Sequence, residues 1–388
     1  MVPVQPDIDR LLGVEAIDFE GNVYLGTRTA PGAGALVSFG PLGELRWSLP
    51  LGDVQSVALS TLSDGGLVGY STAMTDAGAT IVAFSSNGSV VRRRGFPGLT
   101  TARDLALVNE GTSYTPMVHL FDGGGFVVQW NPEAPERALF AVVGDDEAPP
   151  SASAPGARAN VSSSSSFLGR EARYVGRSSG RPVVFSVRSD AGVLSRQPDS
   201  ATALPNGLTV AMAFGQLTRL WGPGAGPVVS SPGGVGTLVS ECPIVFDRQS
   251  NPRACTVVPG ERFEVTPVLS RRFTPPISSS EAYLMQVSSS RTLVLARPDG
   301  GIAALERLPL DGGRPFAPLA LGCHRPEPGR AANLSLSLLY VTTDDGQVLS
   351  IVTPSTGLNT DAAWPKHQGG LVNQGTDEGE VALRAECP

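Results

Sequence analysis

Short apolar runs separated by glycine-bearing turns recur along the whole chain. In the clearest copy, the run Tyr24–Thr27 is followed by a Pro-Gly loop, the run Leu36–Phe39 and a turn at Pro41–Gly43 that leads to Trp47. Near the other end of the chain, Tyr340–Thr343 begins a similar unit. Val, Leu and Tyr favour strands, and Asp-Gly, Asn-Gly and Ser-Gly pairs suit the tight turns of hairpins. The pattern therefore predicts antiparallel β-hairpins along the chain.

The turn glycines indicate a repeat. Gly43, Gly88, Gly192, Gly300 and Gly357 are separated by 45, 104, 108 and 57 residues, and we interpret the two long gaps as double steps. Seven units of roughly 52 residues result, which is close to the upper end of propeller-blade periods. Radial stacking of four-stranded units leaves few open sheet edges. We predict an all-β fold, a single β-propeller of seven blades built from four-stranded antiparallel sheets, with six or eight blades as alternatives.

One repeat unit and two irregular segments interrupt the pattern. The fifth unit is the weakest copy, because its runs Leu217–Trp221 and Pro243–Phe246 are separated by the Gly/Pro/Ser-rich residues 222–236. Residues 144–166 contain a Pro/Ala/Ser stretch and five consecutive serines, a composition that cannot bury a core. We expect residues 1–388 to form one domain, with 144–166 and 222–236 as surface-loop insertions. Long loops on one rim of a rigid scaffold are where binding tends to occur.

Charge and hydropathy narrow the classes of partner. The net charge is −7, and all but one of the 29 basic residues are arginine, the exception being Lys366. This argues against nucleic acid as the main partner. The basic run Arg92–Arg94 is interpreted as the solvated edge of an outer strand. No stretch approaches the roughly 20 apolar residues of a transmembrane helix, and residues 1–12 lack the features of a signal peptide. We expect a soluble monomer without a transmembrane segment.

The four cysteines indicate the kind of cellular compartment in which the protein resides. Cys242 and Cys255 flank the turn expected in the fifth unit, and residues so placed in an antiparallel hairpin face each other. A bridge between Cys323 and Cys387 would attach the C-terminal tail, residues 364–388, to the last blade. Four cysteines allow three connectivities, and the spacing favours these two pairs. Because disulfides persist in oxidising compartments, we expect a periplasmic, cell-envelope or extracellular location.

Residues for catalysis or metal binding are few. The histidines His119, His324 and His367 share no spacing that would place them at one site, and Cys323-His324 lacks a second pair to complete a zinc site. No Gly-x-Ser-x-Gly elbow precedes a helix. We therefore predict no catalytic, cofactor-binding or metal-binding residue and no cofactor. Three acidic turns also lack the alternating aspartates of a calcium loop, namely Asp122-Gly123, Asp299-Gly300 and Asp344–Gly346.

The first unit carries a family resemblance. Residues Ala16–Thr27 and the continuation Gly43–Trp47 resemble the repeats of quinoprotein-like (pyrroloquinoline-quinone-type) β-propellers, in which an x-D-x-x-G-x-x-Y-x-G hairpin precedes a Gly-x-x-x-Trp ending. In that family the tryptophan docks onto the neighbouring blade, and Trp47 matches this position. The segment Ala363–Gly375 resembles the Trp-Pro-(Lys/Met) segment at the edge of such propellers in secreted bacterial proteins. It lacks the Arg/His-Asp pair usual at Gln368–Gly370.

The resemblance covers most of the chain in architecture, and its motifs are specific in the first and last units. The family includes quinone-dependent dehydrogenases and non-enzymatic envelope scaffolds, among them the lipoprotein propeller of outer-membrane protein assembly. The enzymes carry adjacent cysteines over the cofactor and a calcium held by carboxylates and Asn, which this sequence lacks. The resemblance implies a non-catalytic, extracytoplasmic scaffold of the secreted bacterial branch that binds a protein or glycan partner through its loop rim. The alternatives are a quinone-dependent oxidoreductase, a polysaccharide-acting enzyme with a funnel active site, and a structural surface or adhesin module.

Overall fold

The structure is a computed structural model of the 388-residue chain. It describes residues 10–30, 32–61, 66–99, 101–109, 114–121, 125–130, 138–143, 162–163, 171–178, 181–190, 193–197, 201–203, 209–213, 216–221, 229–231, 234–239, 242–246, 252–255, 268–273, 280–288, 290–296, 302–308, 313–315, 319–324, 336–358 and 371–372.

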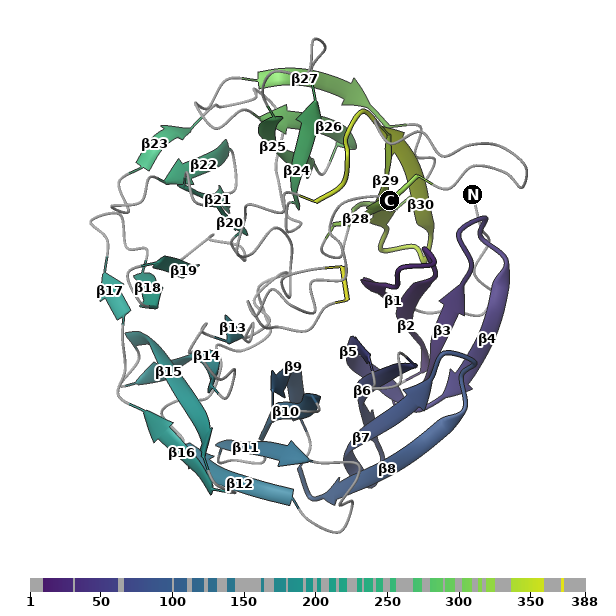
Figure 1. Ribbon diagram of the computed structural model, residues 1–388, viewed down its shortest axis with the longest axis vertical. Coiled ribbons are helices and arrows are strands. Elements are labelled where there is room, and N and C mark those ends of the chain that lie inside the picture. Colours follow the sequence, from purple (N-terminus) through teal and green to yellow (C-terminus); the bar gives the residue numbers. More distant parts are fainter. Residues whose placement is uncertain are drawn as a thin grey trace.

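The described residues form eight antiparallel sheets, which follow one another around a ring (Figure 1). The first four sheets contain β1 (Arg10–Ile17), β2 (Val23–Ala30), β3 (Ala33–Phe39) and β4 (Leu45–Pro50); β5 (Asp53–Thr61), β6 (Leu67–Thr75), β7 (Gly78–Ser85) and β8 (Val90–Pro97); β9 (Thr101–Asn109), β10 (Tyr114–Phe121), β11 (Gly125–Trp130) and β12 (Ala138–Val143); and β13 (Ser162–Ser163), β14 (Glu171–Ser178), β15 (Arg181–Asp190) and β16 (Val193–Gln197). The last four contain β17 (Ala201–Ala203), β18 (Thr209–Ala213) and β19 (Gln216–Trp221); β20 (Val229–Ser231), β21 (Gly234–Val239), β22 (Cys242–Phe246) and β23 (Pro252–Cys255); β24 (Val268–Phe273), β25 (Ser280–Val287), β26 (Thr292–Ala296) and β27 (Ile302–Arg307); and β28 (Ala320–Cys323), β29 (Ser337–Thr342) and β30 (Val348–Thr353).

The expected fifth unit is divided between two sheets, which is why the described residues contain eight sheets and not seven. Leu217–Trp221 lies in β19 of the fifth sheet, whereas Pro243–Phe246 lies in β22 of the sixth. The segment 222–236, expected to be a loop insertion, includes β20 and the beginning of β21. Ser231 pairs with Gly234, so only a Pro-Gly pair separates these strands. Pro-Gly is a turn signal, and the Gly/Ser-rich composition around it obscured the hairpin.

The structure describes only part of the expected loop 144–166 and of the expected tail 364–388. Within 144–166 the structure describes Ser162 and Ser163, which form β13, and the rest of that segment lies outside the described residues. Of the tail 364–388, it describes Leu371 and Val372. Six of the eight sheets have the expected four strands among the described residues, and the other two have three.

Glycine occupies the fourth place of a five-residue turn that recurs among the described residues. In the turns 18–22, 85–89 and 343–347, the first N–H donates to the fifth carbonyl, and the fourth N–H donates to the first carbonyl. The fourth residue has positive φ, at 84° in Gly21, 82° in Gly88 and 87° in Gly346. Glycine adopts this conformation without a Cβ clash, which explains its recurrence in the sequence.

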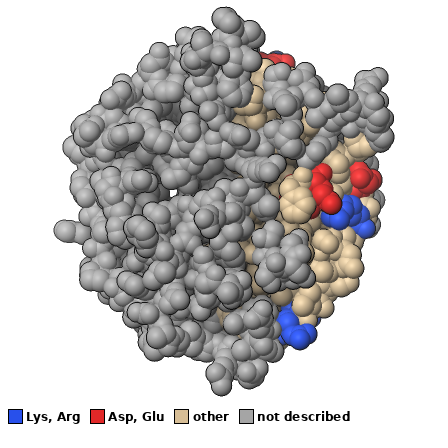
Figure 2. Space-filling model, viewed as in Figure 1, with Lys and Arg blue, Asp and Glu red and all other residues tan. Residues whose placement is uncertain are grey.

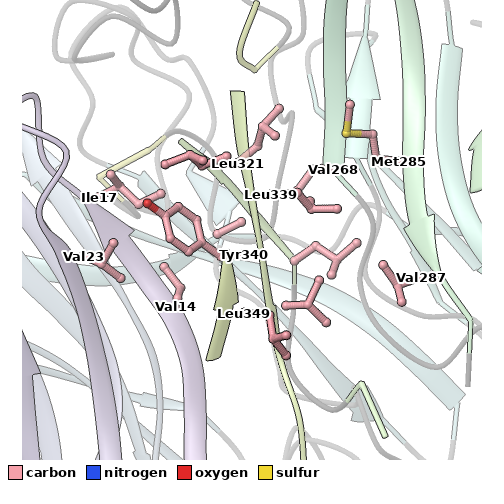
Figure 3. Packing of buried hydrophobic residues seen from close by; sticks show 14 of the residues in the cluster. Val14, Ile17, Val23, Val268, Met285, Val287, Leu321, Leu339, Tyr340 and Leu349 are labelled. Atoms are coloured by element: carbon pink, nitrogen blue, oxygen red, sulfur yellow. The ribbon is translucent and has the colours of Figure 1, made fainter. Parts of the chain in front are cut away.

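Buried apolar side chains between neighbouring sheets hold the ring together. One cluster joins the first, seventh and eighth sheets, and in Figure 3 Val14 and Ile17 of β1 lie on the side of Tyr340 in β29, whereas Leu339 of β29 lies on the side of Val268 in β24. Strand β1 contacts β28 and β29, so the two ends of the repeat are neighbours in space. Two further clusters lie between the first and second sheets and between the second and third sheets. The first, second, third, seventh and eighth sheets thus bury apolar side chains against their neighbours.

The described part of the C-terminal tail lies against two inner strands. The carbonyl of Leu371 accepts a 2.8 Å hydrogen bond from the N–H of Ile17 in β1, and the carbonyl of Val372 accepts one of 2.8 Å from Leu59 in β5. Leu371 also belongs to the cluster that includes the eighth sheet. Attachment of this tail to the last blade through Cys387 stays a prediction, because Cys387 lies outside the described residues. Among the described residues, no helix has the length and hydrophobicity needed to cross a membrane.

Candidate functional site at the turns of the first two sheets

Three turns of the first two sheets lie at neighbouring positions of the ring. Val23 is opposite both Ile17 and Phe39, so the turns 18–22 and 40–44 project from the same end of the first sheet. Side chains of β4 contact the turn 85–89 of the second sheet. We call these three turns, with the exposed apolar residues Phe19, Leu42 and Leu45, the first rim.

Asp18 builds the first of these turns. Its carboxylate is buried, and Oδ1 accepts 2.9 Å hydrogen bonds from the main-chain N–H groups of Glu20 and Asn22. Oδ2 accepts hydrogen bonds from Asn22 Nδ2 at 2.8 Å and from the Tyr24 hydroxyl at 2.9 Å. Four donors therefore satisfy the carboxylate, and the Asp-x-x-Gly-Asn pattern of the sequence has a structural role in this turn.

Tyr24 connects this turn to the sheet interior. The pKa of the Tyr24 hydroxyl is raised above its usual value by burial and by the charge of Asp18, which outweigh the opposing effect of Arg46. The phenol therefore stays neutral and keeps donating its hydrogen bond to Asp18 at any physiological pH. The Tyr24–Asp18 hydrogen bond is thus part of the structure of the turn.

Arg46 and Trp47 of β4 reach the second sheet. Arg46 Nη1 donates to Ser38 Oγ at 3.0 Å, and Nη2 donates to the Ser86 carbonyl at 3.3 Å. Trp47 Nε1 donates to the same carbonyl at 2.9 Å. The indole centroid lies 5.8 Å from the rings of Tyr24 and Phe84, with edge-to-face geometry. At the position where the family resemblance places a docking tryptophan, Trp47 thus contacts the neighbouring sheet.

The apolar side chains of the first rim are exposed although the turns that carry them are held firmly. Phe19, Leu42 and Leu45 are 49%, 55% and 50% exposed. Single exposed apolar residues are common, but here Phe19 and Leu42 in the two turns and Leu45 at the start of β4 lie at one end of one sheet. The N–H of Gly40 donates to the carbonyl of Glu44, which closes the second turn as Asp18 closes the first. The result is an apolar surface on a preorganised backbone, which suits contact with another macromolecule.

An acidic turn in the eighth sheet binds a neighbouring segment of the chain. Asp344 Oδ1 accepts a 2.7 Å hydrogen bond from the Arg314 N–H, and Asp345 Oδ2 accepts one of 2.8 Å from the Gly313 N–H. Burial acts to raise the pKa of Asp345, but hydrogen bonds from the Thr343 hydroxyl and main-chain N–H groups outweigh it, and the pKa lies below its usual value. Main-chain N–H groups of residues 313 and 314 thus bind both carboxylates. Among the described residues, no group of three or more His, Cys, Asp or Glu side chains could hold a metal ion.

The predicted cysteine pairs are only partly within the described residues. Cys323 at the end of β28 is disulfide-bonded, and its partner is not among the side chains that the structure describes. Strands β22 and β23 pair as the expected hairpin, but a register irregularity after Val245 places Cys255 opposite Ile244 and not opposite Cys242. Both pairings, Cys242 with Cys255 and Cys323 with Cys387, stay predictions.

Charged side chains are mixed on the face shown in Figure 2, where basic and acidic residues of the described part lie among uncharged ones. Binding to a phosphate backbone usually uses a continuous basic surface. The expectation that nucleic acid is not the main partner stays a prediction.

Comparison with known proteins gives the fold. No family model matches the chain, and no curated protein matches it. Two crystal structures of BBS1N in complex with ARL6DN, soaked with mercury and with lead, are 14% and 13% identical to this chain and have TM-scores of 0.50. Both alignments cover 91% of this chain and 95% of BBS1N. BamB from Moraxella catarrhalis is 14% identical over 89% of this chain and 86% of BamB, with a TM-score of 0.36. BBS1N is a β-propeller, and the ring of antiparallel sheets described here is an all-β fold of the same kind.

Proposed function

We propose that this chain is a non-catalytic β-propeller scaffold that binds a protein partner through the first rim. The observation that carries the proposal is the exposure of Phe19 and Leu42 on two turns whose backbones are fixed by internal hydrogen bonds, with Leu45 exposed at the start of the adjoining strand β4. Protein interfaces place apolar and aromatic side chains at their centre, and a rigid surface loses little conformational entropy on binding. An apolar rim fits a protein better than a glycan.

The fold is compatible with such a role. BBS1N was crystallised in complex with ARL6DN, so a protein of this fold can bind a protein partner. Fold alone does not determine function, so the binding role proposed for this chain depends on the residues of its own first rim. We further propose that the chain belongs to the quinoprotein-like branch named by its repeat motif, acts as a monomer and needs no cofactor.

The proposed location is extracytoplasmic, in the periplasm, the cell envelope or the extracellular space. It is supported by Cys323, which is disulfide-bonded, because disulfides persist mainly in oxidising compartments. Peptide mapping of the non-reduced protein would test the location and the two predicted pairings. Free thiols at all four cysteines would contradict both.

Site-specific photo-crosslinking in the source cell tests the binding role. A photo-reactive phenylalanine derivative would replace Leu42 in one variant and Val352 of β30 in a control, because these residues are 55% and 53% exposed. We expect a discrete protein adduct at position 42 that is absent at position 352 and is lost when Phe19→Ser is added. Identical adducts at both positions, or none at position 42, would contradict the proposal. Uptake of pyrroloquinoline quinone with calcium, seen as bound cofactor absorbance, would support the oxidoreductase alternative.

A further inference from the structure

The outer strand of the second sheet has an open edge. Strand β8 is last in the order β5-β6-β7-β8 and lies on the outer side of the ring (Figure 1). Among the described strands it pairs with β7 only. An edge strand presents a row of unpaired N–H and C=O groups, with which another extended chain can pair.

Three consecutive arginines flank this edge. Arg92 and Arg93 are exposed, and Arg94 is partly exposed. Because side chains alternate along a strand, Arg92 and Arg94 lie on one face of β8 and Arg93 lies on the other. Cζ of Arg94 lies over the Phe96 ring, 5.7 Å from its centroid, as expected for side chains two positions apart on the same face of a strand. Positive charge therefore lies on both sides of the open backbone edge.

Within the described part of the chain, Arg92 and Arg93 make no ion pair, since the salt bridge found there joins Arg28 to Asp53. Arg92 Nη1 instead donates a 3.0 Å hydrogen bond to the carbonyl of Val91, its neighbour in sequence. The corresponding outer strand of the seventh sheet, β27, has Glu306 beside Arg307, so its charges balance. The net charge of the whole chain is −7. The positive charge of Arg92 and Arg93 on β8 is thus opposite in sign to the net charge of the chain.

We propose that the edge of β8 binds an extended acidic segment of a partner protein by β-strand addition. The main chain of the segment would pair with the edge, and its side chains would form cross-strand pairs with the arginines. Because the arginines are consecutive and alternate between faces, the matching segment carries consecutive acidic residues. Val90 and Val91, which are 42% and 46% exposed, offer apolar contacts beside that acidic run.

A peptide titration tests this assignment. The probe is a fluorescein-labelled peptide with three consecutive glutamates flanked by valine and threonine, and the readout is fluorescence anisotropy. We expect saturable binding that weakens as salt is added. The double variant Arg92→Glu/Arg93→Glu should weaken binding about tenfold or more, because two attractive pairs become repulsive. The matched variant Arg307→Glu on the outer strand β27 should change the dissociation constant by less than about twofold.

Several results would overturn the proposal. One is the absence of saturable binding, and another is an equal loss in Arg307→Glu and in the double variant. If the double variant fails to fold, as judged by its melting transition, Arg93→Gln replaces it and should still weaken binding severalfold. A peptide of the same charge with alternate N-methylated amides lacks the donors for strand pairing. Equal binding of that peptide would exclude strand addition.

Two further tests distinguish an acidic peptide from other ligands of the β8 edge, and this edge from the first rim. A DNA duplex or a phosphatidylserine vesicle that binds more tightly than the peptide and displaces it would identify a general polyanion site and overturn the peptide assignment. The variant Phe19→Ser/Leu42→Ser should bind the peptide like the unaltered protein, because these residues belong to the first rim and not to β8. The proposal for the first rim and the proposal for the edge of β8 can therefore fail independently of each other.

Discussion

The indole Nε1 of Trp47 donates a 2.9 Å hydrogen bond to the main-chain carbonyl of Ser86, which joins the outer strand of the first sheet to a turn of the second. The same indole packs edge-to-face against Tyr24 in its own sheet and Phe84 in the next. Trp47 therefore contributes both an apolar surface and a directed hydrogen bond to one interface. This dual role allows the two contributions to be measured separately.

Two substitutions of Trp47 should destabilise the protein to different extents. Trp47→Ala is expected to lower the free energy of unfolding by about 2 to 4 kcal/mol, because it removes the aromatic contacts and leaves a gap. Trp47→Phe should keep most of the packing and lose only about 1 kcal/mol with the hydrogen bond. Urea denaturation followed by circular dichroism measures both. Equal losses in the two variants would show that the ring contacts contribute little.

Gly88 should not tolerate a side chain. Its φ is +82°, and a Cβ at this position would lie 2.6 Å from Cδ2 of Trp47. Gly88→Ala is expected to cost about 1 to 3 kcal/mol through backbone strain and displacement of the indole. Gly95→Ala in β8 is the control, since a Cβ there meets no atom within 4 Å. Thermal melts of the two variants should differ by several degrees, and similar melting temperatures would contradict the packing described for Gly88.

Removing the Tyr24 hydroxyl should weaken the first turn. Tyr24→Phe leaves Asp18 Oδ2 with Asn22 Nδ2 as its remaining donor. The expected loss is about 1.5 to 3 kcal/mol, the usual range for a hydrogen bond to a charged group. Because folding raises the pKa of this phenol, its contribution is complete below the unfolded value of about 10 and is lost as the pH rises through the folded value. Denaturation of both proteins at neutral pH, where the hydroxyl is un-ionised, measures the effect, and equal stability there would contradict it.

Acid should remove the contribution of Asp345. Folding lowers its pKa, so its carboxylate stabilises the native state above the unfolded pKa of about 3.9, and this stabilisation is lost as the pH falls through the lower folded value. The difference in unfolding free energy between the unaltered protein and Asp345→Asn should be constant above about pH 5 and shrink below about pH 4. Denaturation series at several pH values measure it. Glu306→Gln, an exposed carboxylate on β27, is the control. A difference that does not change with pH would contradict the assignment.

Much of the local structure was predictable because it depends on neighbours in sequence. The hairpins of the first unit and the glycines of its turns follow from residues at most a few positions apart, and the structure contains them. The count of sheets was not predictable in the same way. The hairpin of β20 and β21 is short and rich in Gly and Ser, so its strands resembled a loop until their pairing was known.

The first rim itself required the structure. Phe19 and Leu42 are apolar residues beside turns, and in the sequence nothing distinguishes them from residues of the core. Their exposure, 49% and 55%, follows from the packing of the folded chain. The same holds for the outer edge of β8, which no other described strand pairs with, since the sequence indicated an outer strand but not what lies beside Arg92 and Arg93.

The sequence by itself determined the strand-turn repeat, the positions of the turn glycines, the acidic net charge and the tryptophan at the end of the first unit, because each of these is a local or compositional property. The tertiary structure decided the number of sheets, the meeting of β1 with β28 and β29, and which apolar and basic side chains stay on the surface. Those features arise from packing between sheets, which brings together residues as far apart in the chain as those of β1 and β29.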